Sequence, residues 1–150
     1  RVGSAGGISE DVAIRDIVLG IGACTDSTVN RARYGGWDFA ATADFGLITA
    51  AAKAAEQAGI ELHAGNLHSS DSFYNPVADA LETWQRMNVL AVEMEAAGLY
   101  AIAHEEHVRA LAIVTISDHL ITQEETSSDE RERTFGDMVT LALETLKLDA

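Results

Sequence analysis

Polar side chains that can bind ligands or transfer protons lie at the expected ends of three strands in this sequence. They are Arg1, Ser4, Glu93, Glu95, Ser117 and Asp118. Ligands of open α/β sheets bind in the crevice at the carboxyl ends of the strands. Each of these residues could instead be a turn former or a helix cap. Their joint placement after three apolar runs favours a shared ligand site.

The segment VEMEAAGLY at 92–100 places two carboxylates, Glu93 and Glu95, between apolar residues on both sides. A carboxylate at the start of a helix is common, because the helix dipole favours negative charge there. The apolar flanks of this pair argue against a simple solvated helix start. The segment is therefore a candidate for binding a ligand.

The net charge limits the partners of the chain. Ten Lys and Arg side chains stand against 24 Asp and Glu, which gives a net charge of −14. Such a field repels nucleic acid backbones and acidic lipid surfaces. No apolar run approaches the roughly 18 residues that a membrane span needs. We therefore expect neither nucleic acid nor a membrane as partner, and an anionic substrate would have to be held locally by arginine and backbone N–H groups.

Three short motifs suggest chemistry that their spacing does not support. HEEH at 104–107 lacks the i and i+4 histidines of a zinc protease, because residue 108 is Val. The side chains of consecutive residues in SDH at 117–119 cannot converge as a catalytic triad does. GIG at 20–22 lacks the third glycine of a dinucleotide fingerprint. We therefore predict no metal site and no dinucleotide site.

Apolar runs rich in Val and Ile predict three buried strands, at 15–24, 91–95 and 110–117. Helical patterns lie between them and after them. The expected apolar stripes are Phe45, Ile48, Ala52 and Ala55 up to a C-cap at Gly59; Ala96, Leu99, Tyr100 and Ala103; and Phe135, Met138, Val139, Ala142 and Leu146. Ser127 and Glu130 have the spacing of a capping box before the last stripe. This alternation predicts an α/β fold.

The start of the chain reads as the tail of a strand that enters a glycine-rich turn, RVGSAGG at 1–7. We therefore expect residues 1–150 to form a single domain that lacks its N-terminal part. The one cysteine, Cys24, cannot form an internal disulfide, which suits a reducing cytoplasm.

Several segments resemble the nucleoside phosphorylases of the hexameric bacterial purine type. VEMEAAGLYAIA is similar to the signature of that family, and RVGSAGG, GACTDS, DSFY, TISDH and ERERTFGDM occur in the family's order. The resemblance covers essentially the whole chain. It implies a mixed central β-sheet flanked by helices, with the family's N-terminal phosphate loop absent from this sequence.

The resemblance implies a role for each residue of the nucleoside site. Glu95 would accept hydrogen bonds from both ribose hydroxyls and face the positive charge that develops at the anomeric carbon. Met94 would pack against the sugar, Glu93 and Val92 would line the base pocket, and Phe73 would stack on the purine. Ordinary core packing is the alternative for Phe73.

The same resemblance assigns phosphate binding and leaving-group protonation. Arg1 and Ser4 would hold phosphate, since a guanidinium can bind two of its oxygens. Asp118, with Ser117 beside it, would donate a proton to N7 of the departing purine, and Arg131 would approach Asp118 transiently to assist. Residues 119–128, which look like a long polar loop, would move during this step.

The implied reaction is the reversible phosphorolysis of purine ribosides and deoxyribosides to free base and pentose 1-phosphate. It needs inorganic phosphate as co-substrate and no metal or organic cofactor. The family assembles as a homohexamer, and we expect a cytoplasmic protein. Three alternatives stay open: a methylthioadenosine or adenosylhomocysteine nucleosidase, a uridine phosphorylase, and a non-catalytic assembly module.

Overall fold

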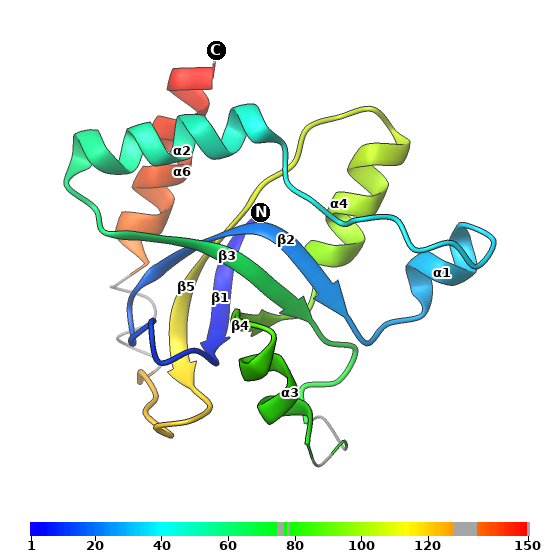
Figure 1. The fold of residues 1–150 in the computed structure, drawn as a ribbon. Coiled ribbons are helices and arrows are strands. Elements are labelled where there is room, and N and C mark those ends of the chain that lie inside the picture. Colours follow the sequence, from blue (N-terminus) through cyan, green and yellow to red (C-terminus); the bar gives the residue numbers. More distant parts are fainter. Residues whose placement is uncertain (75–76, 78, 128–134, 150) are drawn as a thin grey trace.

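Ten helices and strands make up the part of the chain that the computed structural model describes, which is residues 1–74, 77, 79–127 and 135–149 (Figure 1). The strands are β1 (Val2–Gly7), β2 (Ile17–Thr25), β3 (Leu62–Ser69), β4 (Val89–Glu93) and β5 (Ala112–His119). The helices are α1 (Val29–Arg33), α2 (Phe45–Ala58), α3 (Ala80–Arg86), α4 (Ala96–Glu105) and α6 (Gly136–Asp149). The α/β prediction is confirmed.

The five strands form one mixed sheet that closes on itself in the order β1, β4, β3, β2, β5. The strands β2, β3 and β4 are parallel to one another, and β1 is parallel to β5. These two groups run in opposite directions, since β1 pairs with β4 and β2 pairs with β5 in antiparallel fashion. The amino end of β1 therefore lies near the carboxyl end of β4.

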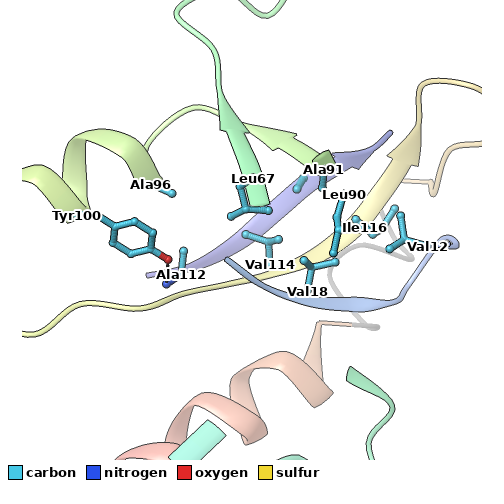
Figure 2. Close-up of a cluster of buried hydrophobic side chains, with 11 residues drawn as sticks. Val12, Val18, Leu67, Leu90, Ala91, Ala96, Tyr100, Ala112, Val114 and Ile116 are labelled. Carbon is cyan, nitrogen blue, oxygen red and sulfur yellow. Dashed lines mark hydrogen bonds between the residues drawn. The ribbon is translucent and has the colours of Figure 1, made fainter. Parts of the chain in front are cut away.

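Two apolar cores stabilise this arrangement. They lie on opposite faces of strands β2 and β5. On one face, Val18 and Val114 join the cluster inside the sheet, which α4 closes with Ala96 and Tyr100 (Figure 2). On the other face, side chains of β2 and β5 pack against α2 and α6, which lie side by side (Figure 1). This second cluster contains Ile17, Leu19, Leu47, Ala51, Ala54, Ala55, Leu111, Ile113, Met138 and Leu141.

Tyr100 joins α4 to the sheet. Its hydroxyl donates to the carbonyl oxygen of Gly20 at 2.5 Å. It also accepts from the N–H of Ala112 at 2.9 Å (Figure 2). Burial raises the pKa of this phenol to about 12, so it keeps its proton at neutral pH. Helix α4, which follows the Glu93 and Glu95 segment directly, is thereby fixed against β2 and β5.

Several local expectations are confirmed and others are wrong. Helix α2 ends at Gly59, whose φ of 67° is the left-handed conformation expected of a C-cap glycine. The buried face of α2 is Leu47, Ala50, Ala51, Ala54 and Ala55. Of the predicted stripe, Ala55 is buried and Ile48 packs against the core, whereas Phe45 and Ala52 are exposed. The many alanines of this helix make its faces hard to distinguish from the sequence.

Helix α6 also differs from the sequence-based expectation. It begins at Gly136, and Glu130 of the expected capping box lies outside the described residues. Met138 is buried as predicted, whereas Val139 and Leu146 of the same stripe are exposed. Among the described helices, none is long and apolar enough to cross a membrane.

Candidate functional site

A cluster of opposite charges forms where the amino end of β1 meets the carboxyl end of β4. The Arg1 guanidinium lies 3.5 Å from the Glu93 carboxylate through Nε and forms a second ion pair with Glu95 through Nη2. Its third nitrogen, Nη1, is buried and has no hydrogen-bond partner within the described part of the chain. The guanidinium also lies over Gly3, where a Cβ would be only 2.7 Å from Nη1. One donor group of Arg1 is therefore unpaired among the described residues.

Glu93 is buried and its carboxylate is fully occupied by the protein. It accepts hydrogen bonds from the N–H groups of Glu95 and Ala96 at 3.0 Å and from the hydroxyl of Ser69. The Ser69 hydroxyl in turn accepts from the N–H of Ala97 at 2.9 Å. Orphan N–H groups at a helix start need such acceptors. Glu93 therefore connects β3 and β4 to the first turn of α4.

Glu95 has different surroundings, although it is only two residues further on. Its side chain is 57% exposed, and among the described residues it forms an ion pair with Arg1. Met94 is also exposed, at 47%. A carboxylate in this position can accept hydrogen bonds from a ligand while Arg1 lies beside it. The two carboxylates thus divide into one that organises the backbone and one that faces outward.

Asp118 of β5 and Val92 of β4 lie on either side of Gly6 in β1. Gly6 pairs with Val92 on one side and with Asp118 on the other. A Cβ at Gly6 would lie 3.1 Å from Oδ2 of Asp118 and 3.3 Å from Val92. The Ser117 hydroxyl donates to Oδ1 of Asp118 at 2.7 Å. The missing side chain at Gly6 therefore leaves room for Leu120, whose Cδ1 would lie 2.5 Å from such a Cβ, as well as for Asp118 and Val92.

The strand directions correct one part of the sequence-based reasoning. Arg1 and Ser4 were expected beside a glycine-rich turn, but residues 2–7 form strand β1 and Arg1 precedes its amino end. The carboxyl ends of β4 and β5 also do not meet at one edge of a parallel sheet, because β1 lies between these strands and is antiparallel to β4. The candidate residues gather along β1 instead.

The segment after Asp118 is more ordered than the expected long loop. Residues Asp118 and Glu125 form a bridge, and the N–H and hydroxyl of Thr126 both donate to the carbonyl oxygen of Ser117. The buried His119 ring lies 3.1 Å from the carbonyl oxygens of Ser9 and Val12. Residues 119–127 thus turn back onto β5. Arg131 lies outside the described residues.

Ser4 and Phe73 are placed on the surface. Ser4 is exposed on β1, and Phe73 is 78% exposed with its ring packed edge-on against Tyr74 at 5.0 Å between centroids. The segment that carries Phe73 follows Ser69, which pairs with Glu93. It therefore begins at the same end of the sheet as Glu95.

Sequence reasoning missed residues whose roles depend on distant partners. Ser69 contacts the site only because β3 lies beside β4, and no local pattern marks it. Gly6 falls within RVGSAGG, but its place between Val92 and Asp118 depends on strand pairing. Asp26 and His119 fall within GACTDS and TISDH, so the segments could have pointed to them. Among the described residues, no group of three or more His, Cys, Asp or Glu side chains could hold a metal ion.

Comparisons with known proteins show the family of this chain. The family model of the phosphorylase superfamily matches residues 1–147. The purine nucleoside phosphorylase DeoD-type of Shewanella amazonensis is 52% identical over 144 residues, which is 96% of this chain and 61% of that protein. The protein of the same name from Actinobacillus pleuropneumoniae serotype 5b is 52% identical over 146 residues, 97% of this chain and 61% of its own length.

A third relative, from Histophilus somni, carries the same name and is 50% identical over 149 residues. The match covers 99% of this chain and 63% of that relative. The chain therefore spans a little over three fifths of the length of these curated relatives.

Proposed function

Since this chain belongs to the phosphorylase superfamily, we propose that it serves the reversible phosphorolysis of purine ribonucleosides and deoxyribonucleosides. The products are the free purine base and ribose or deoxyribose 1-phosphate. Relatives at about 50% identity bear the name purine nucleoside phosphorylase, which supports purine over pyrimidine substrates.

The observation that carries the proposal is Arg1 in contact with both Glu93 and Glu95. A cation beside an exposed carboxylate suits a reaction that joins an anion to a polyhydroxylated sugar. The free Nη1 of Arg1 supplies a charged donor for a phosphate oxygen, with Ser4 as a further donor. Glu95 accepts hydrogen bonds from the ribose hydroxyls, and its negative charge stabilises the positive charge that develops on the sugar in the transition state.

The base would lie further along β1, beside Val92, Gly6 and Asp118. Asp118 acts as the general acid that protonates N7 of the purine, so that the base leaves as a neutral molecule. Ser117 orients its carboxyl group through the 2.7 Å hydrogen bond. Phe73 stacks on the purine, Met94 covers the sugar, and Arg131 assists the proton transfer.

We propose a structural role for Glu93 in place of direct contact with the base. Its carboxylate accepts hydrogen bonds from backbone N–H groups and from Ser69, so we propose that it holds the backbone that carries Met94 and Glu95.

Inorganic phosphate is the co-substrate, and the proposed steps use no metal or organic cofactor. We also propose a homohexamer in the cytoplasm, acting in purine salvage, by resemblance to the family; the free thiol of Cys24 suits that compartment.

A substrate panel tests the proposal against its alternatives. Purine release from inosine and adenosine should require added phosphate, and uridine and methylthioadenosine should be poor substrates. Cleavage of methylthioadenosine without phosphate would indicate a nucleosidase, and preferential cleavage of uridine would indicate a uridine phosphorylase. No cleavage of any nucleoside by the correctly folded protein would favour an assembly module.

A further inference from the structure

The segment that carries Phe73 forms hydrogen bonds with Asp26, which follows strand β2. Sequence reasoning did not connect this strand with the site. Asp26 follows the carboxyl end of β2, two strands away from β4 in the sheet. Its Oδ1 accepts a hydrogen bond from the N–H of Asp71 at 2.9 Å, and its Oδ2 accepts one from the hydroxyl of Ser70 at 3.0 Å. One carboxylate thus binds two consecutive residues of the segment.

This attachment extends to Phe73 through a chain of serine contacts. The Ser70 hydroxyl accepts from the N–H of Ser72 at 3.3 Å, and the Ser72 hydroxyl donates to the carbonyl oxygen of Tyr74 at 2.9 Å. Phe73 lies between Ser72 and Tyr74. The backbone on both sides of the aromatic ring therefore depends on where Ser70 and Asp71 are held.

The opposite side of the segment is attached to the nucleoside site itself. The N–H of Ser70 donates to the carbonyl oxygen of Glu93 at 2.9 Å. Asp26 and Glu93 consequently hold Ser70 from two neighbouring sides, one through its side chain and one through its backbone. The exposed ring of Phe73 itself has only Tyr74 as its ring partner among the described residues. The position of Phe73 must come from its backbone anchors.

The charge of Asp26 suits this task. Burial raises the pKa of the Asp26 carboxyl, but the N–H of Asp71, the Ser70 hydroxyl and the neighbouring His68 ring outweigh it and lower the pKa overall. The group is therefore an anion at neutral pH, and an ionised acceptor makes stronger hydrogen bonds than a neutral one.

We propose that Asp26 is a positioning residue for purine binding, which holds the Ser70–Tyr74 segment so that Phe73 can stack on the base. This inference rests on the proposed function. Phosphate binding is proposed for Arg1 and Ser4, so we expect the loss of Asp26 to weaken nucleoside binding and to leave phosphate binding unchanged.

The test compares Asp26→Ala, Asp26→Asn and a control, Asp38→Ala, in the purified protein. Asp38 is a solvent-exposed acid whose carboxylate pairs with Arg31 at 2.7 Å and does not hold the Phe73 segment. The first readout is the rate of chymotryptic cleavage after Phe73 and Tyr74, assigned by mass spectrometry. The second is the KM for inosine and, separately, for phosphate.

In Asp26→Ala we expect faster cleavage after Phe73 and a KM for inosine raised about tenfold, the size expected for the loss of one charged hydrogen bond. The KM for phosphate should stay at the parent value. Asp26→Asn keeps an oxygen that can accept from Asp71, so both effects should be smaller. Asp38→Ala should match the parent in every readout.

Ser70→Ala provides a second variant that removes one of the two contacts and leaves Asp26 in place. It should also accelerate cleavage, by less than Asp26→Ala, which keeps the proposal testable if Asp26→Ala fails to fold. A parent protein without nucleoside cleavage would contradict the proposed function, while the proteolysis would still show whether Asp26 holds the segment. Parent-like cleavage in both Asp26 variants and Ser70→Ala, or faster cleavage with an unchanged KM for inosine, would overturn the positioning role.

Discussion

At the scale of single residues, burial separates two carboxylates that the sequence presents as a pair. Glu93 accepts hydrogen bonds from backbone N–H groups at the start of α4, and Glu95 projects toward Arg1 with more than half of its side chain exposed. A buried acceptor that satisfies several donors contributes to stability, whereas an exposed carboxylate can bind a ligand. Their substitutions should therefore have different consequences.

Glu95→Gln should lower kcat/KM for inosine by roughly 10²-fold, because the amide has no charge to face the cationic transition state. Glu93→Gln should lower kcat/KM less, but it should reduce the free energy of unfolding by about 1–3 kcal/mol because its NH₂ group cannot accept from backbone N–H groups. Steady-state kinetics and urea unfolding of both variants check this. Equal losses of kcat/KM would show that the roles of the two residues are assigned wrongly.

Asp118→Asn should lower kcat for inosine and adenosine by roughly 10²- to 10⁴-fold, because an amide cannot deliver a proton to N7. The loss should depend on the leaving group. The purine of 7-methylguanosine is already cationic and needs no proton, so the variant should cleave it nearly as well as the parent does. An equal loss of kcat on all three nucleosides would mean that Asp118 serves binding or folding.

At the scale of elements, α4 follows the site segment, and the Tyr100 hydroxyl helps to fix this helix to β2 and β5. Tyr100→Phe removes the hydroxyl that contacts Gly20 and Ala112 and should cost about 1–3 kcal/mol of unfolding free energy. Tyr34→Phe is the control, because the hydrogen bond of the Tyr34 hydroxyl to the Glu105 carboxylate, at 3.2 Å, is solvent-exposed. Urea unfolding measures both. A loss of similar size in the two variants would contradict the account of Tyr100.

The end of α2 and the buried face of α4 were predicted from the sequence, whereas the arrangement of the elements was not. Gly59 ends α2 and Ala96, Tyr100 and Ala103 bury one face of α4, because capping and helical periodicity are local properties. The closure of the sheet depends on pairing between strands far apart in sequence, as between β1 and β5. For the same reason the sequence could mark Glu93 as unusual but not show Ser69, 24 residues earlier, as its partner.

At the scale of the whole molecule, stability should fall as the solution becomes acidic. Burial lowers the pKa of His68 below its usual 6.5, against the opposing effect of the Asp26 carboxylate. As the pH falls through 6.5, the unfolded chain therefore binds a proton at this residue before the folded chain does, and unfolding becomes easier. The neutral ring is held between Cys24, with Nδ1 3.5 Å from Sγ, and Trp84, which stacks on it at 4.2 Å.

His68→Phe keeps an aromatic ring against Trp84 and removes this titration. The free energy of unfolding should fall less between pH 7.5 and pH 5.5 in the variant than in the parent, as measured by urea unfolding at the two pH values. The same decrease in both proteins would show that His68 does not contribute to the acid sensitivity.

We propose that phosphate attacks the sugar of a purine nucleoside bound between Arg1, Glu95 and Asp118. The most direct measurement is ³¹P NMR of the protein with inosine and inorganic phosphate. We predict that a pentose 1-phosphate signal grows as the inorganic phosphate signal declines, in step with the release of hypoxanthine. Release of hypoxanthine with inorganic phosphate as the only phosphorus signal would contradict the claim, because water would then be the nucleophile.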